Sequence, residues 1–135
     1  MTSSSVRLLL RPLAWLWALP TTLLGLPFVA GSLASGGRAR WIAGALEVHG
    51  GVTKFLLRRS SVLPGGVDAL TLGHVVAGRS AASLARWRDH ERVHVRQCEC
   101  WGPLFVPAYL CASLVAWTRG ADPYLDNRFE RAARR

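Results

Sequence analysis

The stretch that decides the fold reads Asp89-His90-Glu91-Arg92-Val93-His94-Val95-Arg96-Gln97. It contains the pattern His-Glu-x-x-His, which on a helix places both imidazoles one turn apart on the same side, where they can share a metal ion. Glu91 lies one position past the first histidine. It would not bind the metal, but it would reach a water molecule held there and take its proton. The pattern therefore predicts a zinc site with a general base.

The residues around this pattern allow a long helix. The segment from Ser80 to Trp101 has no proline or glycine, Ser80 or Ser83 can cap its start, and Gly102-Pro103 ends it. At about 100° per residue, one face is charged and carries Arg88, Asp89, Arg92, Arg96 and Glu99. The opposite face carries Trp87, His90, Glu91, His94, Cys98 and Trp101. We expect this second face, with both histidines, to turn inward.

A catalytic zinc site needs a third protein ligand and leaves one position to water. The other donors that we consider are His74, Glu99, Asp122, Asp126 and Glu130. Glu99 lies on the charged face of the predicted helix, and Asp122 precedes Pro123 in a segment typical of a cap or turn. The residues by themselves leave the choice open.

The combination of His90-Glu91-x-x-His94 with a glutamate on a later helix resembles the gluzincin group of zinc metallopeptidases. It is most similar to their small members, the minigluzincins, and to small bacterial membrane proteins that carry this signature. The resemblance covers roughly residues 68–134 and is strongest over 89–102 and 122–134. It implies zinc ligands at His90, His94 and Glu130, with Glu91 as the general base or acid.

The second motif departs from the form that is usual in that group. The usual form is Asn-Glu-x-x-x-Asp, whereas here the glutamate stands in Asn127-Arg128-Phe129-Glu130-Arg131-Ala132-Ala133. This departure puts the role of Glu130 in question more than the roles of the two histidines.

Composition places the chain near a membrane. Its 135 residues are enough for one domain, half of them are hydrophobic, and the formal net charge is +9. The basic residues are sixteen arginines and one lysine, a balance that suits a surface beside anionic lipid headgroups. They form no single run and no nucleic-acid motif is present, so we expect no nucleic-acid partner. The three cysteines, Cys98, Cys100 and Cys111, match no disulfide framework or zinc-ribbon spacing, and we expect them to pack as small apolar residues.

The segment Pro12–Gly37 contains no charged residue and is long enough to span a bilayer with some tilt. Pro20 and Pro27 would kink such a helix. The alternative is a cleaved signal peptide, because Arg7 and Arg11 precede the apolar run and Ser32-Leu33-Ala34 offers a small-residue cleavage site. We expect a membrane anchor over residues 1–37 and a metal-binding domain over 38–135. A slight excess of basic residues after the anchor favours a cytoplasmic domain.

Residues 40–78 are typical of β structure. We expect strands over 41–48 and 52–57, joined by a hairpin at Gly50-Gly51, and a third strand over 69–77. The resemblance implies that this third strand is the sheet edge along which a peptide substrate lies; a half-buried ordinary strand is the alternative. His74 within it either polarises a substrate carbonyl or is an ordinary strand histidine.

A second charge-free run covers residues 102–118. It predicts an apolar helix over 103–118 that is short for a membrane span and returns the chain so that Glu130 can approach His94. The predicted fold is therefore α+β: a small antiparallel sheet, the metal-binding helix, a later helix with Glu130, and one or two membrane or membrane-embedded helices.

The function that we expect is that of a membrane-associated zinc hydrolase, most simply a metallopeptidase, whose partners are a lipid bilayer and a peptide or protein substrate. One alternative is a non-catalytic metal-binding or structural membrane protein. The other is a zinc hydrolase that acts on a lipid or another amide.

Overall fold

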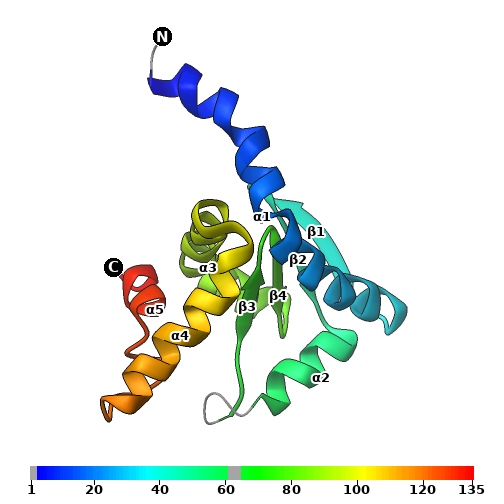
Figure 1. Cartoon of the computed structure of the whole chain (residues 1–135). Coiled ribbons are helices and arrows are strands. Elements are labelled where there is room, and N and C mark those ends of the chain that lie inside the picture. Colours follow the sequence, from blue (N-terminus) through cyan, green and yellow to red (C-terminus); the bar gives the residue numbers. More distant parts are fainter. Residues whose placement is uncertain (1–2, 61–64) are drawn as a thin grey trace.

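The computed structural model describes residues 3–60 and 65–135. The fold is α+β, with a four-stranded sheet between helices (Figure 1). The elements in chain order are α1 (Ser3–Ala34), β1 (Arg38–Ile42), β2 (Ala45–His49), α2 (Gly51–Arg59), β3 (Ala69–Leu72), β4 (Val75–Gly78), α3 (Ala81–Trp101), the short 3-10 helix η1 (Gly102–Leu104), α4 (Phe105–Thr118) and α5 (Arg128–Ala133).

The first hairpin lies elsewhere than the sequence predicts. It turns at Ala43 and Gly44, which both have positive φ (47° and 84°), the backbone that a tight two-residue hairpin requires. The segment 52–57, predicted as a strand, belongs to helix α2. Its buried side chains are Thr53 and Leu57, one helical turn apart, whereas a strand would bury alternate residues. The predicted strand 41–48 is therefore wrong in its boundaries, and the predicted strand 52–57 is wrong in its type.

The predicted third strand is two strands. Gly73 and His74 form a turn that separates β3 from β4. Gly73 has φ 62°, and a Cβ atom there would lie 2.2 Å from Thr22 Oγ1, so the turn is pressed against α1. Only glycine combines this backbone with so close an approach. His74 is therefore a turn residue, not a strand residue.

The sheet is mixed, not antiparallel as predicted. Its strand order is β1-β2-β4-β3, with β2 parallel to β4 and the other two pairs antiparallel. The parallel pair arises because β3 starts at the end of the sheet where β2 finishes and runs back in the opposite direction, so β4 enters the sheet in the same direction as β2. Strand β3 is left at the edge of the sheet, and β4, which directly precedes α3, is inside it.

The two faces of the sheet pack against different helices. On one face, Val48, Val75 and Ala77 contact the side chains of Phe28 and Val29 from α1. On the other face, Ala45 and Val76 pack with Leu84 and Val95 from α3. A third cluster joins the helices and consists of Ala18, Cys98, Phe105 and Phe129.

Helix α1 therefore belongs to the core of the protein over its C-terminal half. Ala18, Thr21 and Ser32 are buried along the stripe that faces the domain, whereas the N-terminal half projects away from it (Figure 1). The expected division at residue 37 thus separates elements that pack together; residues 1–2 lie outside the described part. The C-terminal half of α1 covers one face of the sheet, so cleavage near Ser32-Leu33-Ala34 would uncover that face.

Helix α3 occupies the segment predicted to be helical, and Ser80 is its cap: the Ser80 hydroxyl accepts a hydrogen bond from the Ser83 N–H. Gly102, with φ 56°, follows its last residue. The division into faces is only partly as predicted. Glu91, His94 and Cys98 are buried, but Arg88 and Arg92 turn onto buried Glu47 of β2 instead of facing solvent.

Two stretches, Ser5–Ala34 and Ala81–Thr118, are long and apolar enough to cross a membrane. In each, only 17% of the most apolar 18-residue window is buried inside the protein. The charged residues of α3 end at Glu99, so the apolar part of the second stretch is η1 with α4. Most of the apolar side chains of α1 and α4 thus face outward.

Candidate metal centre

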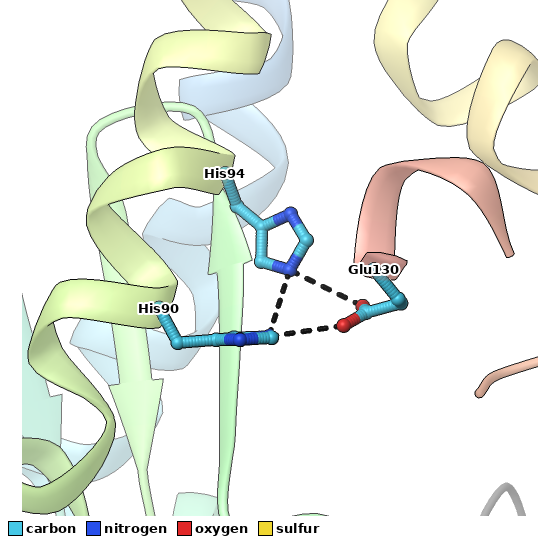
Figure 2. Close-up of side chains that lie close together, drawn as sticks. All are labelled: His90, His94 and Glu130. Carbon is cyan, nitrogen blue, oxygen red and sulfur yellow. Dashed lines mark hydrogen bonds and ion pairs between the residues drawn. The ribbon is translucent and has the colours of Figure 1, made fainter. Parts of the chain in front are cut away.

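Helices α3 and α5 bring three donor side chains to one point (Figure 2). His90 Nε2 lies 2.9 Å from Glu130 Oε2, and His94 Nε2 lies 3.2 Å from Glu130 Oε1. The two Nε2 atoms are 3.2 Å apart. One donor atom from each residue lies within 4.8 Å of the others. The structure thus brings together the histidine pair predicted from helical spacing and the glutamate that the family resemblance implies.

Asn127 fixes the short helix that carries Glu130. Its Oδ1 accepts from the Phe129 N–H at 2.9 Å, which caps α5. Its Nδ2 donates to the Tyr109 carbonyl and the Ser113 hydroxyl, at 3.0 and 2.8 Å, which ties α5 to α4. The side chain is fully buried. Asn127 therefore fixes the position of Glu130 relative to α4.

Gln97 links His94 to α5. Its Nε2 donates to the Phe129 carbonyl at 3.1 Å, so its Oε1 faces His94 Nδ1 at 2.8 Å. His94 Nδ1 therefore donates to Gln97, which leaves Nε2 as the ring nitrogen that faces Glu130 and would bind a metal ion once deprotonated. Such a partner on the far nitrogen orients a metal-binding imidazole and fixes its tautomer.

Glu91 is buried against the edge strand. The Thr71 hydroxyl of β3 donates to Glu91 Oε2 at 2.6 Å. Thr71 pairs with Val76 across the sheet, so it lies on the face that α3 covers. Glu91 is not among the three donors of the cluster, yet it lines the same cavity as His94 and Glu130. Glu91 thus lies beside the cluster without belonging to it.

Charge at the centre is balanced between the carboxylates and the imidazoles. Burial would raise the pKa of Glu130, but hydrogen bonds from His90 and His94 outweigh it and hold that pKa well below its usual range. Burial lowers the pKa of His94, and the neighbouring Glu130 raises it by more, so positive charge is favoured there. Burial raises the pKa of the Glu91 carboxyl, opposed by His94 and the Thr71 hydrogen bond. The three donors thus form one electrostatically coupled cluster that could hold a cation.

A cavity of about 310 Å³ opens beside the cluster. Glu91, His94, Glu130 and Thr71 form its polar end, together with the hydroxyl-bearing Tyr109 and Tyr124. Burial raises the pKa of the Tyr124 phenol, so this group remains a proton donor. The rest of the described lining is almost wholly apolar: Leu57, Val67, Ala69, Leu70, Leu72, Phe105, Val106 and Leu110, with Ser60.

The remaining candidates lie away from the cluster. His74 does not face the cavity: its Nε2 lies 2.9 Å from Glu99 Oε1, and its ring stacks on Trp15 of α1 at 3.7 Å between centroids. The structure therefore does not bring His74 to the cluster, and its contacts fit the alternative of an ordinary buried histidine. Asp122 and Asp126 accept backbone N–H groups within the turn before α5.

Sequence reasoning missed four residues that surround the cluster, namely Thr71, Gln97, Tyr109 and Tyr124. Gln97 had a detectable signal, since it stands three residues after His94 on the same predicted helix. Tyr109, whose hydroxyl donates to Glu130 Oε1 at 2.7 Å, had none, because its contact depends on how α4 and α5 pack.

The donor set itself is suited to zinc. Two imidazole nitrogens and one carboxylate are the ligands of many catalytic zinc sites, which leave a fourth position for water or substrate. The chain matches no family model, no curated protein and no solved structure with which it was compared. The chemistry of the site therefore rests on its own geometry.

Replacing Gln97 by leucine is expected to weaken zinc binding by about 10- to 100-fold, because His94 loses the partner that orients it. Gln97→Glu keeps the acceptor for His94 Nδ1 and loses only the bond to α5, so its loss should be smaller. Competition with a chromophoric chelator measures both affinities. Arg96→Leu, at an exposed neighbouring position of α3, is the control. An unchanged affinity in Gln97→Leu would contradict the positioning role.

Proposed function

We propose that this protein is a membrane-associated zinc hydrolase that cleaves peptide bonds. The observation that carries the proposal is the meeting of His90, His94 and Glu130, whose donor atoms lie within 4.8 Å of one another, next to a cavity that Glu91 lines together with His94 and Glu130. A non-catalytic metal site would have no need of a buried carboxylate that lines the same cavity without being one of the donors.

His90, His94 and Glu130 would hold the ion, and Gln97 and Tyr109 would hold two of these ligands in place. Zinc supplies a Lewis acid that makes water nucleophilic near neutral pH and polarises a carbonyl. The other tasks fall to the chain. Glu91 takes a proton from the attacking water and passes it to the leaving nitrogen. Because Thr71 holds Oε2 of Glu91, the proton is expected at Oε1.

Strand β3 supports a peptide as the substrate. It is an edge strand, with β4 on one side and no strand on its other side among the described residues. Ala69, Leu70, Thr71 and Leu72 all line the cavity. An extended peptide can add to such an edge by backbone hydrogen bonds, which would place it alongside Glu91. In this proposal the Tyr124 hydroxyl takes the role that was considered for His74. It would donate to the carbonyl oxygen of the substrate, which becomes negatively charged during the attack.

Membrane association is supported by the outward-facing apolar side chains of α1 and α4. The strongly basic composition fits contact with anionic headgroups. Arg38, Arg40 and Lys54 follow α1, against Arg7 and Arg11 near its start, and this small excess favours a cytoplasmic domain.

Purified protein is expected to bind about one zinc ion per chain, and His94→Ala is expected to lose most of it. Elemental analysis after zinc loading and desalting measures both. His49→Ala is the matched control, because His49 lies at the end of β2 and outside the cluster. Equal zinc in wild type and His94→Ala would rule out the site, and so would a wild type that retains none. Glu130→Gln tests the third ligand in the same assay.

A further inference from the structure

The cavity borders an exposed apolar surface of helix α4. Residues 102–118 carry no charge. Leu110, Leu114 and Trp117, at spacings of four and three, form one stripe of this helix and are 61%, 56% and 65% exposed. The opposite side packs on the protein through Phe105 and Ala116. So large an exposed apolar stripe marks an interaction site.

Several features of this segment point to a bilayer as what covers the stripe. Trp101 directly precedes the charge-free residues and Trp117 lies near their end, and both side chains are more than a third exposed. Arg119 is the first charged residue after this run. Tryptophan at each end of an apolar segment, with arginine beyond it, is the arrangement of a lipid interface. Helix α1 presents a second apolar surface, with Leu13 and Leu16 62% and 66% exposed. The net charge of +9 adds attraction to anionic headgroups.

Leu110 belongs to both the stripe and the cavity. It lines the cavity together with Val106 and Tyr109 of α4, although 61% of it is exposed. Across from α4, Leu70 of the edge strand also lines the cavity and is 36% exposed. The opening next to the cluster is thus bordered by apolar side chains that continue into the stripe of α4.

Apart from His94 and the proposed metal ion, the described lining offers no cation to a substrate. It contains no lysine or arginine, and its only acidic groups are Glu91 and Glu130, which the proposed chemistry already uses. A charged side chain or a chain-terminal carboxylate would therefore enter unpaired, at a large desolvation cost. Apolar residues inside a polypeptide meet no such cost.

From these observations we infer that the substrate is an internal, apolar segment of a polypeptide held at the membrane, which enters the site past Leu110 from the lipid side of α4. This inference rests on the proposed peptidase function. It requires that cleavage favour large apolar residues next to the broken bond and that Leu110, more than the rest of the stripe, govern entry.

Zinc-loaded full-length protein in phosphatidylcholine vesicles would be given two fluorogenic peptides that carry the same N-terminal acyl chain, so that both reach the same membrane. One peptide has an apolar centre, and the other has aspartate and lysine in its place. A third, apolar but without the acyl chain, reports on delivery from water. The acylated apolar peptide is expected to have a kcat/KM at least about tenfold above that of either other peptide.

Leu110→Gln and Leu114→Gln form a matched pair, one turn apart on the same stripe, of which only Leu110 lines the cavity. Leu110→Gln should lower kcat/KM for the acylated apolar peptide by about tenfold, and Leu114→Gln should change it little. Equal losses in the two variants, equal rates on the three peptides, or hydrolysis of the acyl amide in place of the peptide would overturn the inference while leaving a zinc hydrolase. If zinc-loaded wild type cleaves none of the three, the proposed peptidase function falls, and the inference falls with it.

Discussion

Glu91→Gln is expected to lower peptide hydrolysis at least about 10²-fold while zinc stays bound and the fold is unchanged. Glutamine keeps the size of the side chain and can still accept from Thr71, so the contact between α3 and β3 survives. It has no basicity, so the proton of the attacking water has no acceptor. Glu91 is not one of the three clustered donors, and for that reason the metal should remain.

Glu99→Gln is the matched control for this experiment. Glu99 is a second glutamate of α3, two turns further on, but it pairs with His74 and does not line the cavity. Turnover of a peptide mixture, zinc content and thermal melting should be measured for wild type and both variants. Equal turnover in wild type and Glu91→Gln would show that Glu91 is not the base. Loss of zinc or of the fold in Glu91→Gln would instead favour the non-catalytic alternative.

The part of the site that sequence could predict is the part that a single helix determines. His90, Glu91 and His94 stand at fixed positions on α3, whose cap at Ser80 and end before Gly102 are local signals. Helical spacing alone brings the two histidines together. Glu130 lies thirty-six residues after His94, and only the family resemblance pointed to it.

The sheet was harder to predict because its signals are ambiguous at short range. The pair Gly50-Gly51 is typical of a hairpin, yet the hairpin forms at Ala43-Gly44, and the apolar run after Gly51 can form a strand or a helix equally well. Its helical state follows from the burial of Thr53 and Leu57, which is a tertiary effect. The parallel pairing of β2 with β4 follows from β3, which returns the chain along the edge of the sheet before β4 forms.

Partners distant in sequence explain the errors on the faces of α3. Helical periodicity places Arg92 on the charged face of α3, which we expected to be exposed. Periodicity alone cannot show which other element packs against that face. In the structure, Glu47 of β2 is buried and accepts from Arg88 at 2.9 Å through each of its oxygens, and from Arg92 at 3.2 Å. These pairs are separated by 41 and 45 residues, so no local sequence pattern indicates them.

Glu47→Gln is expected to lower the free energy of unfolding by about 3 kcal/mol, the lower end of what breaking a buried ion pair costs. The side chain of Arg92 is only 14% exposed, and its Nε already has no hydrogen-bond partner. Removing the negative charge leaves that guanidinium without a carboxylate, with the Ile42 carbonyl as a neutral partner. Arg88, which is 35% exposed, can turn toward water and should contribute less to the loss.

Chemical denaturation in a mild detergent measures the change, and Asp68→Asn is the control. Asp68 pairs with Arg79 at 3.6 Å, and its side chain is 38% exposed, so this loss should stay below about 1 kcal/mol. Adding Arg92→Met to Glu47→Gln removes the unpaired charge and keeps an apolar side chain of similar length, so the double variant should recover most of the stability. Equal small losses for Glu47→Gln and Asp68→Asn, with no recovery in the double variant, would mean that the network between β2 and α3 does not stabilise the fold that positions the histidines.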